Sequence, residues 1–146
     1  MSTQKILVLC TGNSCRSQIA EAYLKKFTNG KADIFSAGVE VHGLNPKAVK
    51  TMAEDGIDIS KQTSNHVDEY STIRFDYIIT VCDHANEVCP YIPGNAIRIH
   101  KNFSDPAKAT GTEMEISESF RSTREEIKTW CKNFCEIELA SNPEHK

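Results

Sequence analysis

A short apolar run that ends in a polar loop containing two cysteines is the feature that most constrains this chain. Residues 6–9 are all apolar, which is typical of a strand buried on both faces. The polar loop spans residues 10–17, and apolar residues then recur at spacings of three and four as far as Phe27. This spacing predicts an amphipathic helix that ends at Asn29 and Gly30. A buried strand, a polar loop and a helix in this order indicate an α/β protein.

Strands and helices continue to alternate along the chain. Further strands are predicted at residues 34–36, 77–81 and 96–99, and further helices at residues 45–56 and along residues 116–134. In the first of these helices Val49, Met52 and Ala53 are expected to face the core. The pattern predicts one domain over residues 1–140 with a doubly wound, four-stranded parallel sheet flanked by helices. Residues 141–146 are expected to form a mobile tail.

Composition excludes several classes of protein. A chain of 146 residues suits one core, and no apolar run reaches the roughly 20 residues needed to cross a bilayer. A net charge of -3 leaves no basic face that would favour nucleic acid. The first residues lack the pattern of an export signal, and a core of this size needs no disulfides. We therefore interpret the six cysteines as thiols of a cytosolic protein, which we expect to be a monomer.

The loop after the first strand has the composition of an oxyanion-binding loop. Cys10 and Arg16 are separated by five residues. Backbone amides of the loop and of the helix N-terminus would converge on a tetrahedral anion, and Arg16 could bind two of its oxygens. The positive end of the helix and the Ser17 hydroxyl are expected to lower the pKa of Cys10, which makes it a nucleophile. Gly12 and Asn13 tolerate the positive φ that such a loop requires.

This loop resembles the phosphate loop of low-molecular-weight tyrosine phosphatases and of the arsenate reductases related to them. The resemblance implies the fold of that family. It implies that the whole loop binds the oxyanion, through Cys10, Thr11, Gly12, Asn13, Ser14, Cys15, Arg16 and Ser17. It also makes Asp105, which precedes Pro106, the general acid that protonates the leaving oxygen. The alternatives from the residues alone are a buried core cysteine at position 10 and an Asp-Pro turn.

A second cysteine motif favours a reductase. Residues 80–90 contain Cys82 and Cys89 and resemble the redox segment of thioredoxin-coupled arsenate reductases. The resemblance implies that Cys10 attacks arsenate, Cys82 displaces arsenite, and Cys89 forms the final bridge with Cys82, which thioredoxin reduces. Glutaredoxin with glutathione is the alternative donor. If the first and third strands are neighbours, Cys82 lies near Cys10, and a helix between Cys82 and Cys89 must unwind before they can bond.

Three other interpretations stay open. The main alternative is a protein tyrosine phosphatase that uses Cys10, Arg16 and Asp105. In those phosphatases aromatic residues follow the Asp-Pro pair, whereas Ala107 and Lys108 follow it here. The second alternative is a sensor that binds the oxyanion without turnover. The third treats the thiols at positions 82 and 89 as core residues or as half of a metal site.

The resemblance further implies a monovalent cation beside the loop. The matching residues are Asn13, Glu21, Ser36 and Asn65, and a carboxylate at position 65 would bind the ion better than the amide. Potassium is the one cofactor that this pattern suggests, and none is required. The remaining cysteines and the histidines are predicted to pack in the core or lie at the surface: Cys131, Cys135, His42, His66, His84, His100 and His145.

Overall fold

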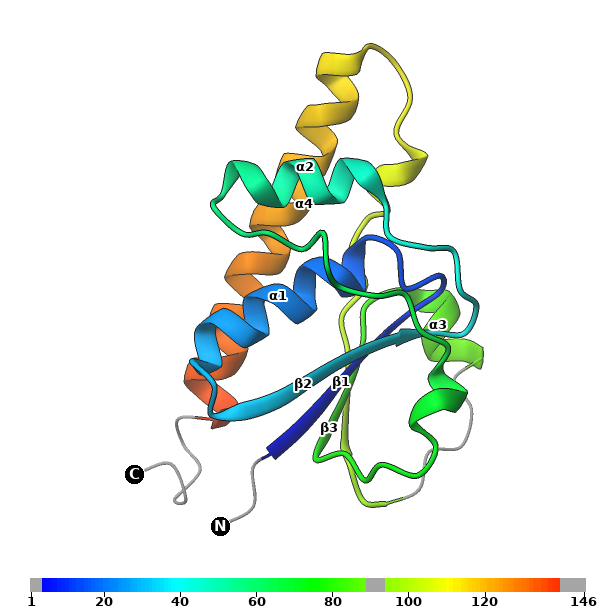
Figure 1. Cartoon of the computed structure of the whole chain (residues 1–146), viewed down its shortest axis with the longest axis vertical. Coiled ribbons are helices and arrows are strands. Elements are labelled where there is room, and N and C mark those ends of the chain that lie inside the picture. The colour runs from blue at the N-terminus through cyan, green and yellow to red at the C-terminus, as the bar shows by residue number, and fades with distance from the viewer. Residues whose placement is uncertain (1–3, 89–93, 140–146) are drawn as a thin grey trace.

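The computed structural model describes residues 4–88 and 94–139, and its centre is a four-stranded parallel sheet (Figure 1). The strands lie in the order β2-β1-β3-β4. Their bounds are β1 (Gln4–Cys10), β2 (Ala32–Gly38), β3 (Tyr77–Thr80) and β4 (Ile97–His100). The predicted parallel sheet is therefore confirmed. The first and third strands are neighbours, which brings their carboxyl ends to the same edge.

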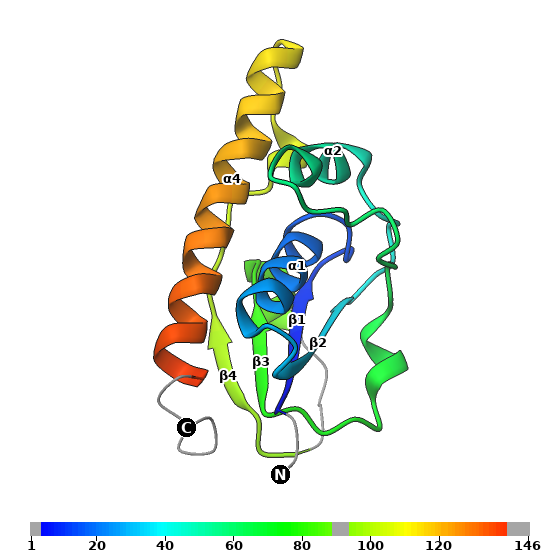
Figure 2. The same ribbon diagram turned by 60° about the vertical axis from the view of Figure 1, so that its left-hand side comes forward.

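In the described part of the chain, four α-helices and three shorter helical segments accompany the sheet. They are α1 (Arg16–Thr28), α2 (Pro46–Glu54), α3 (Asp83–Val88) and α4 (Glu113–Phe134), with the 3-10 turns η1 (Val67–Tyr70) and η2 (Pro106–Lys108) and the π-helical turn η3 (Cys135–Leu139). Figure 2 shows α1 in front of the sheet and α4 along its left-hand side, and the two helices pack together. In contrast, α3 contacts β1 and β3 at the carboxyl edge.

The sheet is covered on both faces. Successive residues of a strand point to opposite faces, and residues 6–9 of β1 are all fully buried. On one face the core continues into α1 through Ile19, Tyr23 and Leu24. This burial explains why the sequence of β1 is continuously apolar instead of alternating.

Two predicted details differ from the structure. Met52 is buried and Val49 packs against the core as predicted, but Ala53 is exposed, and Ala48 and Thr51 complete the inner face of α2, which packs against α4. The fourth strand begins at Ile97 and is mostly exposed, since it forms the edge of the sheet.

A further prediction is confirmed, and another concerns residues outside the described ranges. The two cysteines near the end of α4, Cys131 and Cys135, are buried and free, which confirms their packing role. The tail at residues 141–146 lies outside the described part of the chain. Of the helices in the described ranges, none combines the length and the apolar character that crossing a membrane requires.

Candidate active site

The loop at residues 11–15 joins the carboxyl end of β1 to the N-terminus of α1, and its carbonyls point outward. Three of them, and the carbonyl of Cys10 before the loop, accept hydrogen bonds of 2.8 to 3.2 Å from amides of the segment after β2: Val39 to Cys10, Glu40 to Thr11, His42 to Gly12 and Asn45 to Ser14. The C=O of one residue and the N-H of the next belong to one trans peptide unit and point in opposite directions, so these bonds turn the amides inward. The side chain of Cys15, the N-cap residue of α1, makes no capping hydrogen bond within the described ranges. The amides of the first helical turn are thus left to serve an anion.

Asn13 fixes the shape of the loop. It has a φ of 50°, and its fully buried side chain donates to Ser17 at 2.8 Å and to Ser36 at 2.9 Å. Its amide oxygen accepts a hydrogen bond from the backbone of Asn65 at 2.8 Å. The predicted positive φ is confirmed at Asn13 but is wrong for Gly12. Gly12 is required for another reason, because a Cβ there would lie 2.2 Å from the ring of His42.

Arg16 and Asp105 meet beside the loop. One terminal nitrogen of Arg16 donates to the carbonyl oxygen of Phe103 at 2.9 Å, and the other lies 3.6 Å from a carboxylate oxygen of Asp105. Asp105 also caps η2 by accepting from the amide of Ala107 at 3.0 Å. The structure therefore brings the two predicted site residues together. The contribution of Phe103 was not predicted, because it comes from a main-chain carbonyl that has no sequence signature.

Cys82 lies next to Cys10 without any rearrangement. Cys82 follows β3, and its sulfur is 3.2 Å from the hydroxyl oxygen of Thr11. The Cys10 thiol donates a hydrogen bond to the Cys82 sulfur, and this bond lowers the pKa of Cys82 to about 5. The same contact and burial together raise the pKa of Cys10. The two buried thiols thus form one coupled pair.

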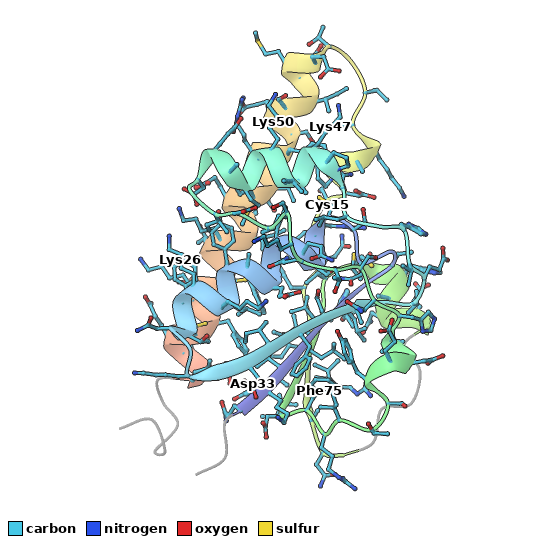
Figure 3. The ribbon with its side chains drawn as sticks, viewed as in Figure 1. Cys15, Lys26, Asp33, Lys47, Lys50 and Phe75 are labelled. Carbon is cyan, nitrogen blue, oxygen red and sulfur yellow. The ribbon has the colours of Figure 1, made fainter. Side chains whose placement is uncertain are left out.

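The two thiols share one proton, which stabilises the thiolate of one sulfur at the expense of the other. The expectation that the helix N-terminus lowers the pKa of Cys10 stays a prediction. Cys15, at the first turn of α1 (Figure 3), is buried, and burial raises its pKa to about 12, so it stays a thiol.

The chain beyond Cys82 enters α3 at once. This helix is described as far as Val88, so the segment between the two predicted relay cysteines is helical up to that residue. Cys89 itself lies outside the described residues, and its role stays a prediction.

The residues predicted to hold a cation come together but are already bonded to one another or to neighbours. Ser36 donates to one oxygen of Glu21, and the Lys25 ammonium binds the other. The side-chain oxygen of Asn65 accepts a bond from Thr63. A potassium ion would have to replace these bonds and compete with the lysine, so the present donor set fits it poorly. The proposed mechanism does not use a potassium ion. In addition, the described residues contain no cluster of three or more His, Cys, Asp or Glu side chains that could hold a metal ion.

The fold and the loop define a class: a single-domain α/β protein with a Cys-x5-Arg loop at the carboxyl edge of its sheet. The model of the low molecular weight phosphotyrosine protein phosphatase family matches residues 5–143, and the chain belongs to this family.

Several proteins to which the chain is similar are arsenate reductases. The chain is 50% identical over 136 residues to the arsenate reductase of Halalkalibacterium halodurans, which covers 93% of this chain and 98% of that protein. Among solved structures it is similar to an arsenate reductase in the phosphate-binding state, with 30% identity, a TM-score of 0.76 and coverage of 92% and 98% of the two chains. It is also similar to an arsenate reductase in the oxidized state, with 30% identity, a TM-score of 0.78 and coverage of 90% and 95%.

Proposed function

We propose that this protein is an arsenate reductase that uses Cys10, Cys82 and Cys89 as a thiol relay and thioredoxin as electron donor. The observation that carries the proposal is the contact between Cys10 and Cys82 at the base of an oxyanion loop. Hydrolysis of a phosphorylated cysteine needs only water, whereas reduction of arsenate needs a second thiol within reach of the first. The arsenate reductases to which the chain is similar favour the same function.

The relay balances two electrons in three steps. Cys10 attacks arsenic(V), and Asp105 protonates the oxygen that leaves as water. Cys82 then attacks the Cys10 sulfur, so that the electron pair of the S-As bond stays on arsenic and arsenite departs. The product is a Cys10-Cys82 disulfide. Cys89 attacks Cys82 and frees Cys10, and the dithiol of thioredoxin reduces the remaining Cys82-Cys89 bridge.

The hydrogen bond between the two sulfurs has a role in these reaction steps. Cys10 is the donor in the resting enzyme, so its proton can pass to Cys82 as Cys10 attacks the oxyanion. Arg16 and the inward-facing amides would hold the negative charge of the bound anion at that moment. Cys82 gives the proton to a departing arsenite oxygen when it becomes the nucleophile in turn. In this scheme Cys82 is a thiolate in the resting enzyme, a thiol while Cys10 is bound to arsenic, and a thiolate again when it attacks.

A coupled assay tests the proposal against its rivals. NADPH consumption is followed with thioredoxin and thioredoxin reductase after arsenate is added, and hydrolysis of an aryl phosphate is measured in parallel. A reductase gives the first signal. A phosphatase that works only through Cys10, Arg16 and Asp105 gives only the second, and a sensor gives neither. Replacing thioredoxin by glutaredoxin and glutathione identifies the donor.

Substitution of single cysteines tests the relay itself. Cys89→Ser should stop after one turnover with a Cys10-Cys82 bridge, because no thiol remains to resolve it. Cys135→Ser is the matched control, since Cys135 is a free buried cysteine near the end of α4, away from the loop. Multiple turnovers at the wild-type rate in Cys89→Ser would remove Cys89 from the mechanism. Mass mapping after one turnover identifies the bridge directly.

A further inference from the structure

His100, which sequence reasoning left without a role, joins β3, β4 and the first residue of α3. Its Nδ1 is 2.7 Å from the hydroxyl oxygen of Thr80, and its Nε2 is 2.7 Å from a carboxylate oxygen of Asp83. Thr80 ends β3, His100 ends β4, and Asp83 begins α3 directly after Cys82. We call the chain of contacts from Thr80 through His100 to Asp83 the His100 clamp.

Other contacts hold α3 only weakly. Of the side chains described for this helix, Ala85 is buried, whereas those at positions 83, 84, 86 and 87 are exposed. A buried methyl group changes an equilibrium constant by only about fourfold. Among the described residues, two polar contacts outside the clamp are long, at 3.2 Å from the amide of Asp83 to Asn102 and 3.4 Å from Thr80 to Asn86, and the backbone of Ala85 also donates to the Cys82 sulfur. A helix of six residues has little stability of its own, so the clamp supplies much of what keeps it folded.

We propose that His100 is a positioning residue whose clamp keeps α3 helical and thereby opposes formation of the Cys82-Cys89 bridge. This inference rests on the proposed function, because it assigns the clamp a part in the relay. While the clamp is closed, Asp83 is fixed and the neighbouring Cys82 sulfur stays beside Thr11 and Cys10, ready for the first disulfide. Release of the clamp lets α3 unwind, and only then can the second disulfide form.

The effect expected on the helix is a faster local opening. In His100→Ala the amides of residues 86–88 should exchange hydrogen about tenfold faster than in the wild-type protein, while those of β1 stay unchanged. His66→Ala is the matched control, because His66 forms a similar pair with Asp68, at 3.5 Å, on η1. It should leave exchange in α3 unchanged. Equal exchange of α3 in His100→Ala and wild type, or no protection of these amides in either, overturns the proposal.

A double-mutant cycle isolates the contact between His100 and Asp83. Asp83→Ala alone also removes a negative charge from the first turn of α3, but that loss is the same with or without His100 and cancels in the cycle. The two substitutions should therefore be clearly less than additive in their effect on exchange. Asp83→Asn keeps an oxygen that can accept from Nε2 and should preserve most of the protection. Additive effects would mean that the clamp does not hold the helix.

The coupling to the relay is measured as a reduction potential. In a Cys10→Ser background, glutathione disulfide oxidises Cys82 and Cys89 to a disulfide and is itself reduced to two glutathione molecules. Adding His100→Ala should favour the bridge about tenfold, which makes its potential about 30 mV more negative. An unchanged potential overturns the proposal. If no bridge forms in any buffer, the proposed function fails instead, and the exchange of α3 still shows whether the clamp holds the helix.

Discussion

Replacing Asn13 should destabilise the protein by an amount that separates its hydrogen bonds from its backbone conformation. Its side chain makes three buried hydrogen bonds, to Ser17, Ser36 and the backbone of Asn65. At about 1 kcal/mol net for each, Asn13→Gly should cost about 3 kcal/mol. Asn13→Ala should cost about 4 kcal/mol, because alanine is strained by about 1 kcal/mol at positive φ. With a urea slope of about 2 kcal/mol per M, the glycine variant should unfold at a midpoint about 1.5 M lower.

Asn29 provides the control for this experiment. It has nearly the same backbone conformation, with a φ of 51°, but is an exposed residue at the end of α1. Asn29→Gly should change the free energy of unfolding by only a few tenths of a kcal/mol, and Asn29→Ala should cost about 1 kcal/mol. The difference between alanine and glycine should thus be equal at the two positions. If Asn13→Gly proves no more costly than Asn29→Gly, the bonds of Asn13 do not hold the loop, and the reasoning is refuted.

Three further predictions concern the thiols, the cation and the contact of α1 with the C-cap residue of α2. The ultraviolet absorbance of a thiolate should rise as the pH passes through about 5 and should be absent from Cys82→Ser, because Cys82 has the lowered pKa. Potassium chloride should stabilise Asn65→Asp more than the wild-type protein. The difference should be about 1.4 kcal/mol in melting experiments with potassium at ten times its dissociation constant, and equal effects would exclude a site there. Tyr23→Phe should lose about 1.5 kcal/mol of unfolding free energy in urea, since Tyr23 donates to Asp55 at 2.6 Å. This bond lowers the pKa of Asp55, so its contribution is complete above the ordinary value of 3.8 and is lost as the pH falls below it, where the two proteins should converge in stability.

Much of the fold could be predicted because the pattern of apolar residues in its central elements matches the residues that are buried there. The first strand is continuously apolar since both of its faces are covered, and α1 ends at Asn29 because this residue adopts a left-handed conformation there. The edge elements were less predictable. β4 is mostly exposed, so its sequence carries little hydrophobic signal, and the inner face of α2 is set by where α4 lies. Such packing depends on long-range contacts that a local pattern does not contain.

The candidate site also has parts that could be predicted from the sequence and parts that could not. Cys10, Arg16, Cys82 and Asp105 were predictable because their side chains carry the chemistry and mark the sequence. The Phe103 carbonyl and the His100 clamp were not, since they depend on which loops the sheet brings together. The coupling of the two thiols was missed for a related reason. The prediction considered the helix N-terminus alone, whereas the structure adds a hydrogen bond between residues 72 positions apart in sequence.

The contacts that shape the loop lie apart from the second thiol, Cys82. This separation explains how one scaffold can support either hydrolysis or a thiol relay. The contacts that shape the loop come from Ser36, from the segment at residues 39–45 and from Asn65, which all lie on the β2 side of β1. Cys82 approaches from β3, on the opposite side, and touches the loop through Thr11 and Cys10. A change at the end of β3 therefore leaves the bonds that shape the loop in place. In the proposed relay, the residue after β3 supplies the thiol that attacks the intermediate on Cys10.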